Sequence, residues 1–316
     1  MGGYNMNNCV MVCNKIKTLC NSQYDFFLKK SNVIGVGLGC KIINGCLTNQ
    51  LCLTVYVTVK RPSNTISPNN FIPKLFCGIP TDVVESGYVS VGTFNCTCSN
   101  SPLHEKVRPC NGGFSIGVDG MPDCSIGCLV KDAADKFYIL TCNHSVAKNS
   151  EHSIGVTPVV QPSPKYGGRV PRDTIATVSK FKKVTLTGDN YIDAVICETN
   201  FSMVSSGLYS LGKIKELEHP TIGKKVAKIG SGSGLTKGTI KSLATVMKIN
   251  FLGKEVLFKD QIITDAITKP GDEGSILINR KTNAAIGLVM GQTGKVTVCN
   301  NIGTVLQLLN VSIVTN

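Results

Sequence analysis

Apolar residues occur after residue 110 mostly in short runs that are separated by turn residues, with hardly a long helical period among them. This pattern predicts a mainly β architecture of sandwich or barrel type. A short helix is expected near the C-terminus, over residues 303–309. The expected strands cover residues 114–118, 125–131, 137–141, 174–181, 191–197, 225–229, 235–246, 255–260, 261–264, 275–279 and 284–290.

The N-terminal third of the chain has a different pattern. Residues 7–30 mix apolar residues with Asn and Lys, which leaves a helix and a loosely docked tail both open. From Asn32 onward, two β-type runs flank Asn44-Gly45, a dipeptide typical of tight hairpin turns. Four prolines between residues 61 and 80 predict an irregular connection. A further short strand is expected over residues 81–85, and the stretch rich in Cys, Asn, Ser and Pro from 95 to 110 is the expected linker.

The composition belongs to the globular class. With 316 residues, 42% of them hydrophobic, the chain can bury one large core or two modest ones. It contains no stretch of eighteen or more apolar residues, so no membrane span is expected. The N-terminus lacks the basic-then-apolar layout of a secretory signal, and a cytoplasmic location is therefore expected.

The fifteen cysteines are expected to be reduced thiols, because the count is odd, the chain is long and no export signal is present. A metal site would need ligands at close and repeated spacing. No group forms a paired C-x-x-C set, so neither a metal nor another cofactor is expected. The most closely spaced groups are Cys9, Cys13 and Cys20, then Cys96, Cys98 and Cys110, then Cys124 and Cys128.

A formal net charge of +13 raises nucleic acid or another anionic surface as a partner. The lysines, however, recur singly through the chain, with only small clusters at residues 182–183 and 224–225. Such spacing favours a solvated basic face over a specific nucleic-acid site.

Three landmarks carry candidate chemistry, and they follow one another along the chain. A β-type run ends at His144, which suits a general base that a rigid sheet holds on a loop. Asp193 is a lone acid in an apolar run and needs a partner such as a histidine. The third landmark is Gly271-Asp272-Glu273-Gly274-Ser275. Alone, each has a plainer interpretation: a surface histidine, a strand-end acid and a charged glycine turn.

Together with their flanks, the landmarks resemble the trypsin-like (chymotrypsin-fold) serine proteases, in particular the bacterial and plant branch with an N-terminal β extension. The resemblance runs from about Asn32 to the C-terminus. It implies two six-stranded antiparallel β-barrels behind a small N-terminal β-containing segment. The motifs that carry it are those at 35–37, 79–84, 112–117, 127–130, 143–144, 192–194, 234–238, 260–262 and 270–272.

The resemblance also implies a division of the chain. Residues 1–31 are expected to form an N-terminal tail or helix, and residues 32–110 the β extension and linker. The first barrel would span residues 111–205 with His144 and Asp193, and the second residues 206–316 with the Gly271–Ser275 loop.

Carried over to this chain, the family's general base is His144 and its orienting acid is Asp193. The nucleophile position is Glu273 instead of Ser, and the backbone N–H groups of Gly271 and Glu273 stand where the oxyanion donors lie. A carboxylate has no hydroxyl proton to give. We therefore expect a plugged site, in which Glu273 either pairs with protonated His144 or accepts the N–H groups meant for substrate.

These observations leave three hypotheses open. The first is a catalytically impaired protease homologue that keeps a body for binding a peptide or protein. The second is an active endopeptidase that uses Ser275, Cys142 or a water molecule; Ser275 lies about 6.6 Å along an extended strand from Glu273, too far to inherit its base without rearrangement. The third is a basic binder of nucleic acid or an anionic surface.

Overall fold

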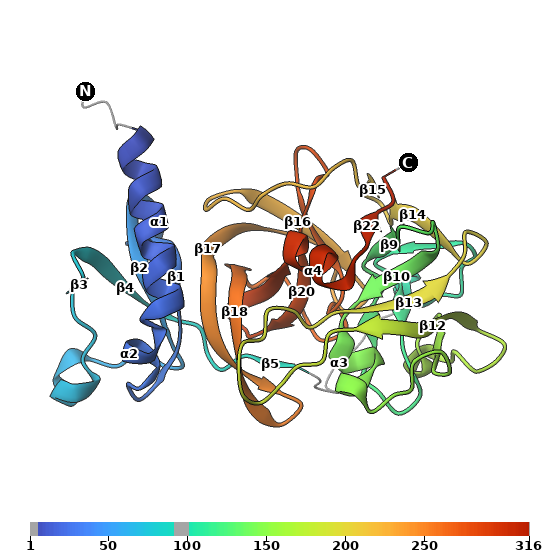
Figure 1. Cartoon of the computed structure of the whole chain (residues 1–316), viewed down its shortest axis with the longest axis horizontal. Helices are drawn as coiled ribbons and strands as arrows, with labels where there is room; N and C mark the ends of the chain where they lie inside the picture. The colour runs from blue at the N-terminus through green and yellow to red at the C-terminus, as the bar shows by residue number, and fades with distance from the viewer. Residues whose placement is uncertain (1–5, 92–100, 316) are drawn as a thin grey trace.

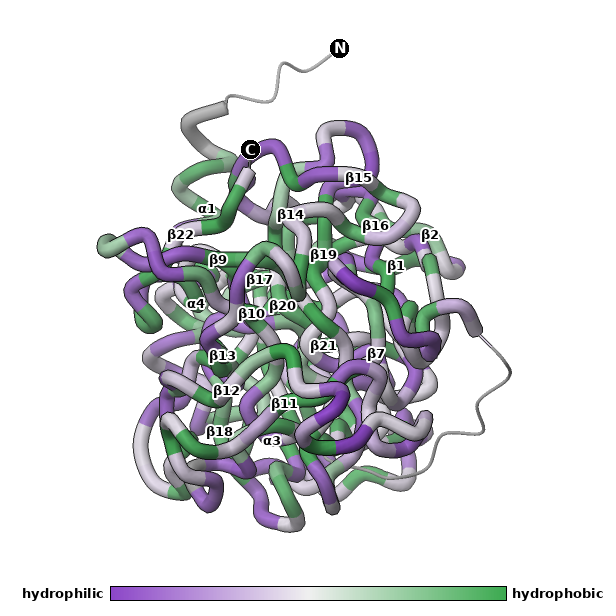
Figure 2. Tube along the Cα trace, turned by 90° about the vertical axis from the view of Figure 1, so that its right-hand side faces the viewer, coloured by the Kyte–Doolittle hydropathy of each residue, from purple (hydrophilic) through white to green (hydrophobic). Residues whose placement is uncertain are grey.

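The computed structural model describes residues 6–91 and 101–315, and its elements are mainly β-strands (Figure 1). Figure 2 shows hydrophobic positions along the interior strands and hydrophilic positions in many of the outer loops. Within the described residues, no helix is long and apolar enough to cross a membrane.

The N-terminal elements form a small layer of helices on strands. Residues 7–30, for which a helix and a tail were both open, contain two helices, and Ile16 and Phe27 are buried against the strands. The predicted hairpin at Asn44-Gly45 is confirmed, and both turn residues have positive φ, of 50° and 78°. The elements are α1 (Met6–Ser22), α2 (Tyr24–Leu28), β1 (Val33–Ile43), β2 (Cys46–Val57), β3 (Leu75–Phe76) and β4 (Ile79–Glu85).

The connection that follows is only partly described. A two-residue strand, β5 (Ser90–Val91), follows β4 in the chain. Of the expected linker, residues 95–100 lie outside the described residues, as do Cys96 and Cys98. The remainder contains a short 3-10 turn, Pro102–His104, and ends in β6 (Cys110–Gly112).

The first half of the body is built on a six-stranded antiparallel sheet with the order β11-β12-β13-β10-β9-β22. Its last strand, β22 (Ser312–Ile313), comes from the C-terminal end of the described residues and pairs with β9. The elements of this half are β7 (Ser115–Ile116), β8 (Cys124–Ser125), β9 (Cys128–Lys131), β10 (Phe137–Thr141), α3 (Asn143–Val146), β11 (Pro158–Val160), β12 (Thr174–Phe181), β13 (Val195–Thr199) and β14 (Val204–Leu208).

The second half is a ring of six strands. Neighbouring strands pair in the order β16-β19-β20-β21-β18-β17, and β16 also pairs with β17, which closes the ring. β1 pairs with β17, so the N-terminal layer continues this sheet. The elements are β15 (Gly212–Lys213), β16 (Lys225–Gly230), β17 (Gly234–Phe251), β18 (Lys254–Asp265), β19 (Ile276–Asn279), β20 (Ala285–Gln292), β21 (Val296–Asn301), α4 (Ile302–Leu309) and β22 (Ser312–Ile313).

Most expected strands are present, and three expectations need correction. The strand expected over residues 125–131 is divided into β8 and β9, with residues 126–127 outside any strand. The predicted strand over residues 191–197 was wrong in its first part, since β13 begins only at Val195. The backbone N–H of Asp193 is held by a side chain, that of Asn300, instead of a neighbouring strand. The two strands expected over 255–264 are one continuous strand, β18, which contains an irregular residue, Asp260, with a φ of 57°.

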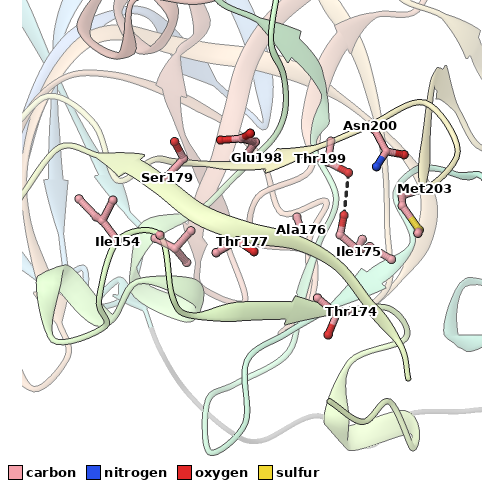
Figure 3. Close-up of a pocket in the computed structure, with 12 residues that line it drawn as sticks. Ile154, Thr174, Ile175, Ala176, Thr177, Ser179, Glu198, Thr199, Asn200 and Met203 are labelled. Atoms are coloured by element: carbon pink, nitrogen blue, oxygen red, sulfur yellow. Dashed lines mark hydrogen bonds between the residues drawn. The ribbon is translucent and has the colours of Figure 1, made fainter. Parts of the chain in front are cut away.

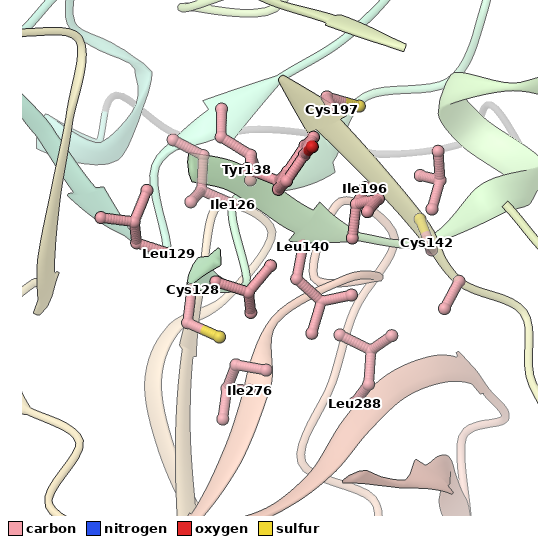
Figure 4. Packing of buried hydrophobic residues seen from close by; sticks show 14 of the residues in the cluster. Ile126, Cys128, Leu129, Tyr138, Leu140, Cys142, Ile196, Cys197, Ile276 and Leu288 are labelled. Carbon is pink, nitrogen blue, oxygen red and sulfur yellow. The ribbon is translucent and has the colours of Figure 1, made fainter. Parts of the chain in front are cut away.

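The two halves share one apolar core. Leu129 and Leu140 of the first half pack in the same buried cluster as Ile276 and Leu288 of the second (Figure 4). The halves are therefore held against each other where β10 ends and β19 begins. This junction brings His144 and the 271–275 loop into the same region of the molecule.

Candidate active site

His144 lies in a one-turn helix, α3, directly after β10. The turn is enclosed on all sides, and the His144 side chain is only 1% exposed. The ring donates through Nδ1 to Asp193 Oδ2, and the backbone N–H of His144 donates to Asp193 Oδ1 at 3.0 Å. Because one carboxylate holds both the ring and the backbone, the imidazole has a fixed position and tautomer.

Asp193 is fully buried and is anchored from the second half of the molecule. Its backbone N–H donates to Asn300 Oδ1 at 2.9 Å, and Asn300 Nδ2 donates in turn to Gln261 Oε1 at 2.7 Å. Asn300 is on β21 and Gln261 on β18. The sequence analysis missed both residues. The signal that was available is that each is a polar residue within a β-type run.

The protonation of His144 is governed by its neighbours. Burial of the ring opposes a positive charge, but the Asp193 carboxylate and the adjacent Cys142 together raise the pKa of His144 well above its ordinary value. An imidazolium beside a buried carboxylate is the charge state that a general base reaches during acyl transfer.

The loop that carries Glu273 is pinned from both halves. The Gly271 carbonyl accepts from Ser125 Oγ at 2.7 Å and from Ser231 Oγ at 2.8 Å, and the Gly274 N–H donates to the Val289 carbonyl at 2.9 Å. Gly271 and Gly274 have φ values of 99° and 84°, a region that residues with a Cβ rarely adopt. The two glycines are therefore required by the backbone path of the loop.

The Asp272 side chain forms a buried ion pair. Its Oδ2 lies 2.7 Å from Lys228 Nζ, and both side chains are fully buried. Asp272 also accepts from the backbone N–H groups of Gly232, Ser233 and Lys269. Burial lowers the pKa of Lys228, which its contact with Asp272 partly offsets. Lys228 is a second residue that the sequence analysis missed, because a single lysine in a β-run gives no sign of burial.

Glu273 occupies the middle of the loop and is 7% exposed. Its Oε2 accepts the backbone N–H of Gly271 at 2.7 Å. Burial raises the pKa of Glu273 to about 7, although the positive charge of His144 and the N–H groups of Glu273 and Gly271 act in the opposite direction. The carboxylate thus takes up an N–H group that the sequence assigned to oxyanion binding.

Of the two kinds of partner that the sequence left open for Glu273, a protonated His144 or backbone N–H groups, the side chain bonds to an N–H group, that of Gly271. In the described part of the chain, Glu273 forms no hydrogen bond or ion pair with His144, and the influence between them is electrostatic. His144 and Asp193 are brought together, and Glu273 lies close enough to act on His144 through its charge.

The two alternative nucleophiles are both buried, and the Cys142 side chain interacts with the His144 ring itself. Ser275 is fully buried, and its Oγ donates to the Asp272 carbonyl at 2.6 Å. Cys142 is also fully buried, and burial raises the pKa of its thiol well above the ordinary value. A thiol held in its neutral form is a poor nucleophile.

A surface hollow of about 530 Å³ lies over β12 and β13, away from this site (Figure 3). Thr174, Thr177, Glu198 and Asn200 are among the residues that line it, and none of His144, Asp193 and Glu273 is. Its polar, open lining gives no arrangement of nucleophile, base and donor. We therefore place the candidate site at the junction of the two halves.

Among known proteins, solved structures resemble this chain. No family model matches the chain, and no curated protein matches it. Protease A of Thermobifida fusca is 19% identical with a TM-score of 0.48, and the similarity covers 65% of this chain and 98% of that one. For the Nocardiopsis protease the identity is 18%, the TM-score 0.49 and the coverage 64% and 97%. A chymotrypsin of Cellulomonas bogoriensis is 21% identical, with a TM-score of 0.48 and coverage of 65% and 98%.

Proposed function

We propose that this protein is a catalytically impaired homologue of the trypsin-like serine proteases, which keeps a body for binding a peptide or protein. The observation that carries the proposal is the position of the Glu273 carboxylate. It stands where the protease loop needs a hydroxyl, and it accepts the Gly271 N–H at 2.7 Å.

Glu273 removes two elements of peptide hydrolysis at once. A Ser nucleophile gives its proton to the histidine as its oxygen attacks the carbonyl, and a carboxylate has no such proton. Attack by the carboxylate on a peptide would produce a mixed anhydride, which is a poorer route than an ester. The same group also brings negative charge to the Gly271 N–H, where an oxyanion would have to be stabilised.

The rest of the site supports an impairment that is confined to the nucleophile position, because the surrounding residues form an ordered arrangement. His144 and Asp193 keep two hydrogen bonds to each other, and the loop keeps its positive-φ glycines. Lys228 and Asp272 fix the loop from inside. The impairment is therefore attributed to one side chain.

The decisive experiment is the Glu273→Ser variant, assayed beside the unmodified protein with a fluorophosphonate probe and with casein. We expect no labelling and no cleavage by the unmodified protein, and labelling of the variant because the base is already in place. Glu273→Gln is the matched control, since it removes the charge without adding a nucleophile. In Glu273→Ser/His144→Ala the labelling should be lost again.

Two results would overturn the proposal. One is cleavage of casein by the unmodified protein; Ser275→Ala and Cys142→Ala would then identify the nucleophile. The other is labelling of Glu273→Ser that persists at the same rate without His144, because the histidine would then have no role as a base.

A further inference from the structure

The N-terminal layer contains a pocket of its own, separate from the candidate active site. Residues 61–72, which lie in the expected irregular connection, contain two 3-10 turns, Ser63–Thr65 and Pro68–Asn70. We call these residues the arch. In Figure 1 the arch is the light-blue segment at the lower left, on the side of the N-terminal layer that lies away from β17. Between the arch and the strands β1, β2 and β4 is a cavity of about 340 Å³, which we call the N-terminal pocket.

The arch is fastened to the strands at its two ends. Just before it, the backbone N–H of Lys60 donates to Glu85 Oε2 at 2.7 Å. Near its other end, Asn70 Oδ1 accepts the Ser31 N–H at 2.8 Å. The hydrogen bonds of residues 62–68, which belong to the described part of the chain, run within the arch itself. The middle of the arch therefore spans the strands without bonding to them, which leaves room for a ligand beneath it.

The floor of the N-terminal pocket is apolar. Val33 of β1 and Val57 of β2 line it and are buried members of the core cluster of the N-terminal layer. Val83 and Ile72, which also line the pocket, pack against the same cluster, and Val59 at its edge is 52% exposed. Such a lining favours an aliphatic ligand. Because a cavity of about 150 Å³ holds one benzene molecule, about 340 Å³ has room for an aliphatic chain of medium length.

The charged residues that line the N-terminal pocket are both cationic. Lys60 and Arg61 are exposed, and in the described part of the chain neither side chain forms a hydrogen bond or an ion pair. The pocket lining contains no Asp or Glu. Glu85, which accepts the Lys60 backbone N–H, forms its ion pair with Lys295. A guanidinium can hold a carboxylate through two parallel hydrogen bonds, so this end of the pocket matches a carboxylate.

We propose that the N-terminal pocket binds an aliphatic carboxylate of medium chain length. The aliphatic chain lies on the valines of the floor, and the carboxylate is held by Arg61 and Lys60. The apolar floor selects the chain, and the two cations without an ion-pair partner select the head group. This site goes beyond the proposed function and does not depend on the chemistry of Glu273.

The test uses the full chain with a tryptophan at the edge of the pocket and decanoate as the probe, below its micelle concentration. The chain has no tryptophan, and Phe71, which lines the pocket, is 44% exposed. In Phe71→Trp we expect decanoate to shift the fluorescence to shorter wavelength, with saturation. Phe201→Trp is the matched control, because Phe201 is 49% exposed and does not line the pocket. Its fluorescence should not respond.

Two comparisons in the Phe71→Trp protein separate the roles of the head group and the chain. Decanol, which lacks the carboxylate, and butyrate, which has a short chain, should each bind at least tenfold more weakly than decanoate. Lys60→Gln/Arg61→Gln should also weaken decanoate binding at least tenfold. Arg280→Gln/Lys281→Gln is its matched control: it removes the same charge from two adjacent exposed residues that do not line the pocket, and should leave binding unchanged.

The proposal is overturned if decanoate gives no saturable response in Phe71→Trp, if decanol binds as tightly as decanoate, or if the loss of Lys60 and Arg61 leaves binding unchanged. Binding to phosphatidylglycerol vesicles that decanoate does not compete would indicate a membrane surface as the partner and would also refute it. Should Phe71→Trp not fold, calorimetric titration of the unmodified protein with decanoate and decanol decides by the same criterion. Fluorophosphonate labelling of the unmodified protein would refute the proposed function separately.

Discussion

Replacing Glu273 by Gln tests whether the negative charge of Glu273 lowers the free energy of unfolding. Gln has the same shape, and its amide oxygen can still accept the Gly271 N–H that Glu273 Oε2 accepts at 2.7 Å. The variant therefore keeps the contact and removes the titration. The difference in unfolding free energy between the two proteins then reports on the ionisation of one buried carboxyl.

The sign and size of this difference in unfolding free energy follow from the pKa of Glu273. Burial raises the pKa of Glu273 to about 7 from its ordinary value of 4.5, so the folded state holds the proton more tightly than the unfolded chain does. The stabilisation by that proton is complete below about pH 4.5 and is lost as the pH rises to about 7. At about 1.4 kcal/mol for each pKa unit, the unmodified protein should become less stable than Glu273→Gln by about 3 kcal/mol at pH 8.

The assay is urea unfolding of both proteins from pH 4.5 to pH 8, followed by circular dichroism because the chain has no tryptophan. Subtracting the two curves removes the other titrating groups, which the proteins share. We expect a difference near zero at pH 4.5 that grows until about pH 7 and then stays constant. The assignment of a destabilising buried carboxylate to Glu273 would be refuted if the difference in unfolding free energy did not change with pH. It would also be refuted if the unmodified protein were the more stable one at pH 8.

Two further substitutions test the support of the Glu273 loop and of strand β5 by urea unfolding. Lys228→Met leaves the buried Asp272 without its cation and should destabilise the protein by about 3–5 kcal/mol, whereas Lys295→Met removes a half-exposed ion pair and should have a much smaller effect; equal effects would contradict the structural role of Lys228. Gly291→Ala places a methyl group against Val91 and should cost about 1–3 kcal/mol while speeding amide exchange in residues 89–91; an unchanged midpoint and exchange rate would show that the strand does not lie where described.

The strands of the body were predictable where a turn marks each end of an apolar run. β10 and β12 have the expected bounds, residues 137–141 and 174–181. The run with Asp193 misled the prediction, because Ile192 and Ala194 are buried without being in a ladder. Periodicity reports burial, and it does not report whether the backbone partner is a strand or the side chain of Asn300.

The central residues of the candidate site could be predicted from the sequence, whereas the residues that hold them in place could not. His144, Asp193 and Glu273 stand out from their runs as residue types, whereas Asn300, Gln261 and Lys228 act only through tertiary contacts. Asn300 lies 107 residues from Asp193 in the chain, and no local pattern links the two. The short strand β5 was missed for the same reason, since two residues gain a ladder only when two distant edges already exist.

The glycines and the aspartate beside Glu273 have structural roles that do not involve catalysis. Gly271 and Gly274 adopt backbone angles that favour glycine, and Asp272 neutralises the buried Lys228. The side chain of Glu273 makes its one hydrogen bond to protein outside its own residue, in the described part of the chain, through Gly271 N–H. The loop therefore holds its shape by the residues on either side of Glu273. Glu273→Ser should leave that shape intact, so its activity or inactivity will measure the chemistry of the site and not a failure to fold.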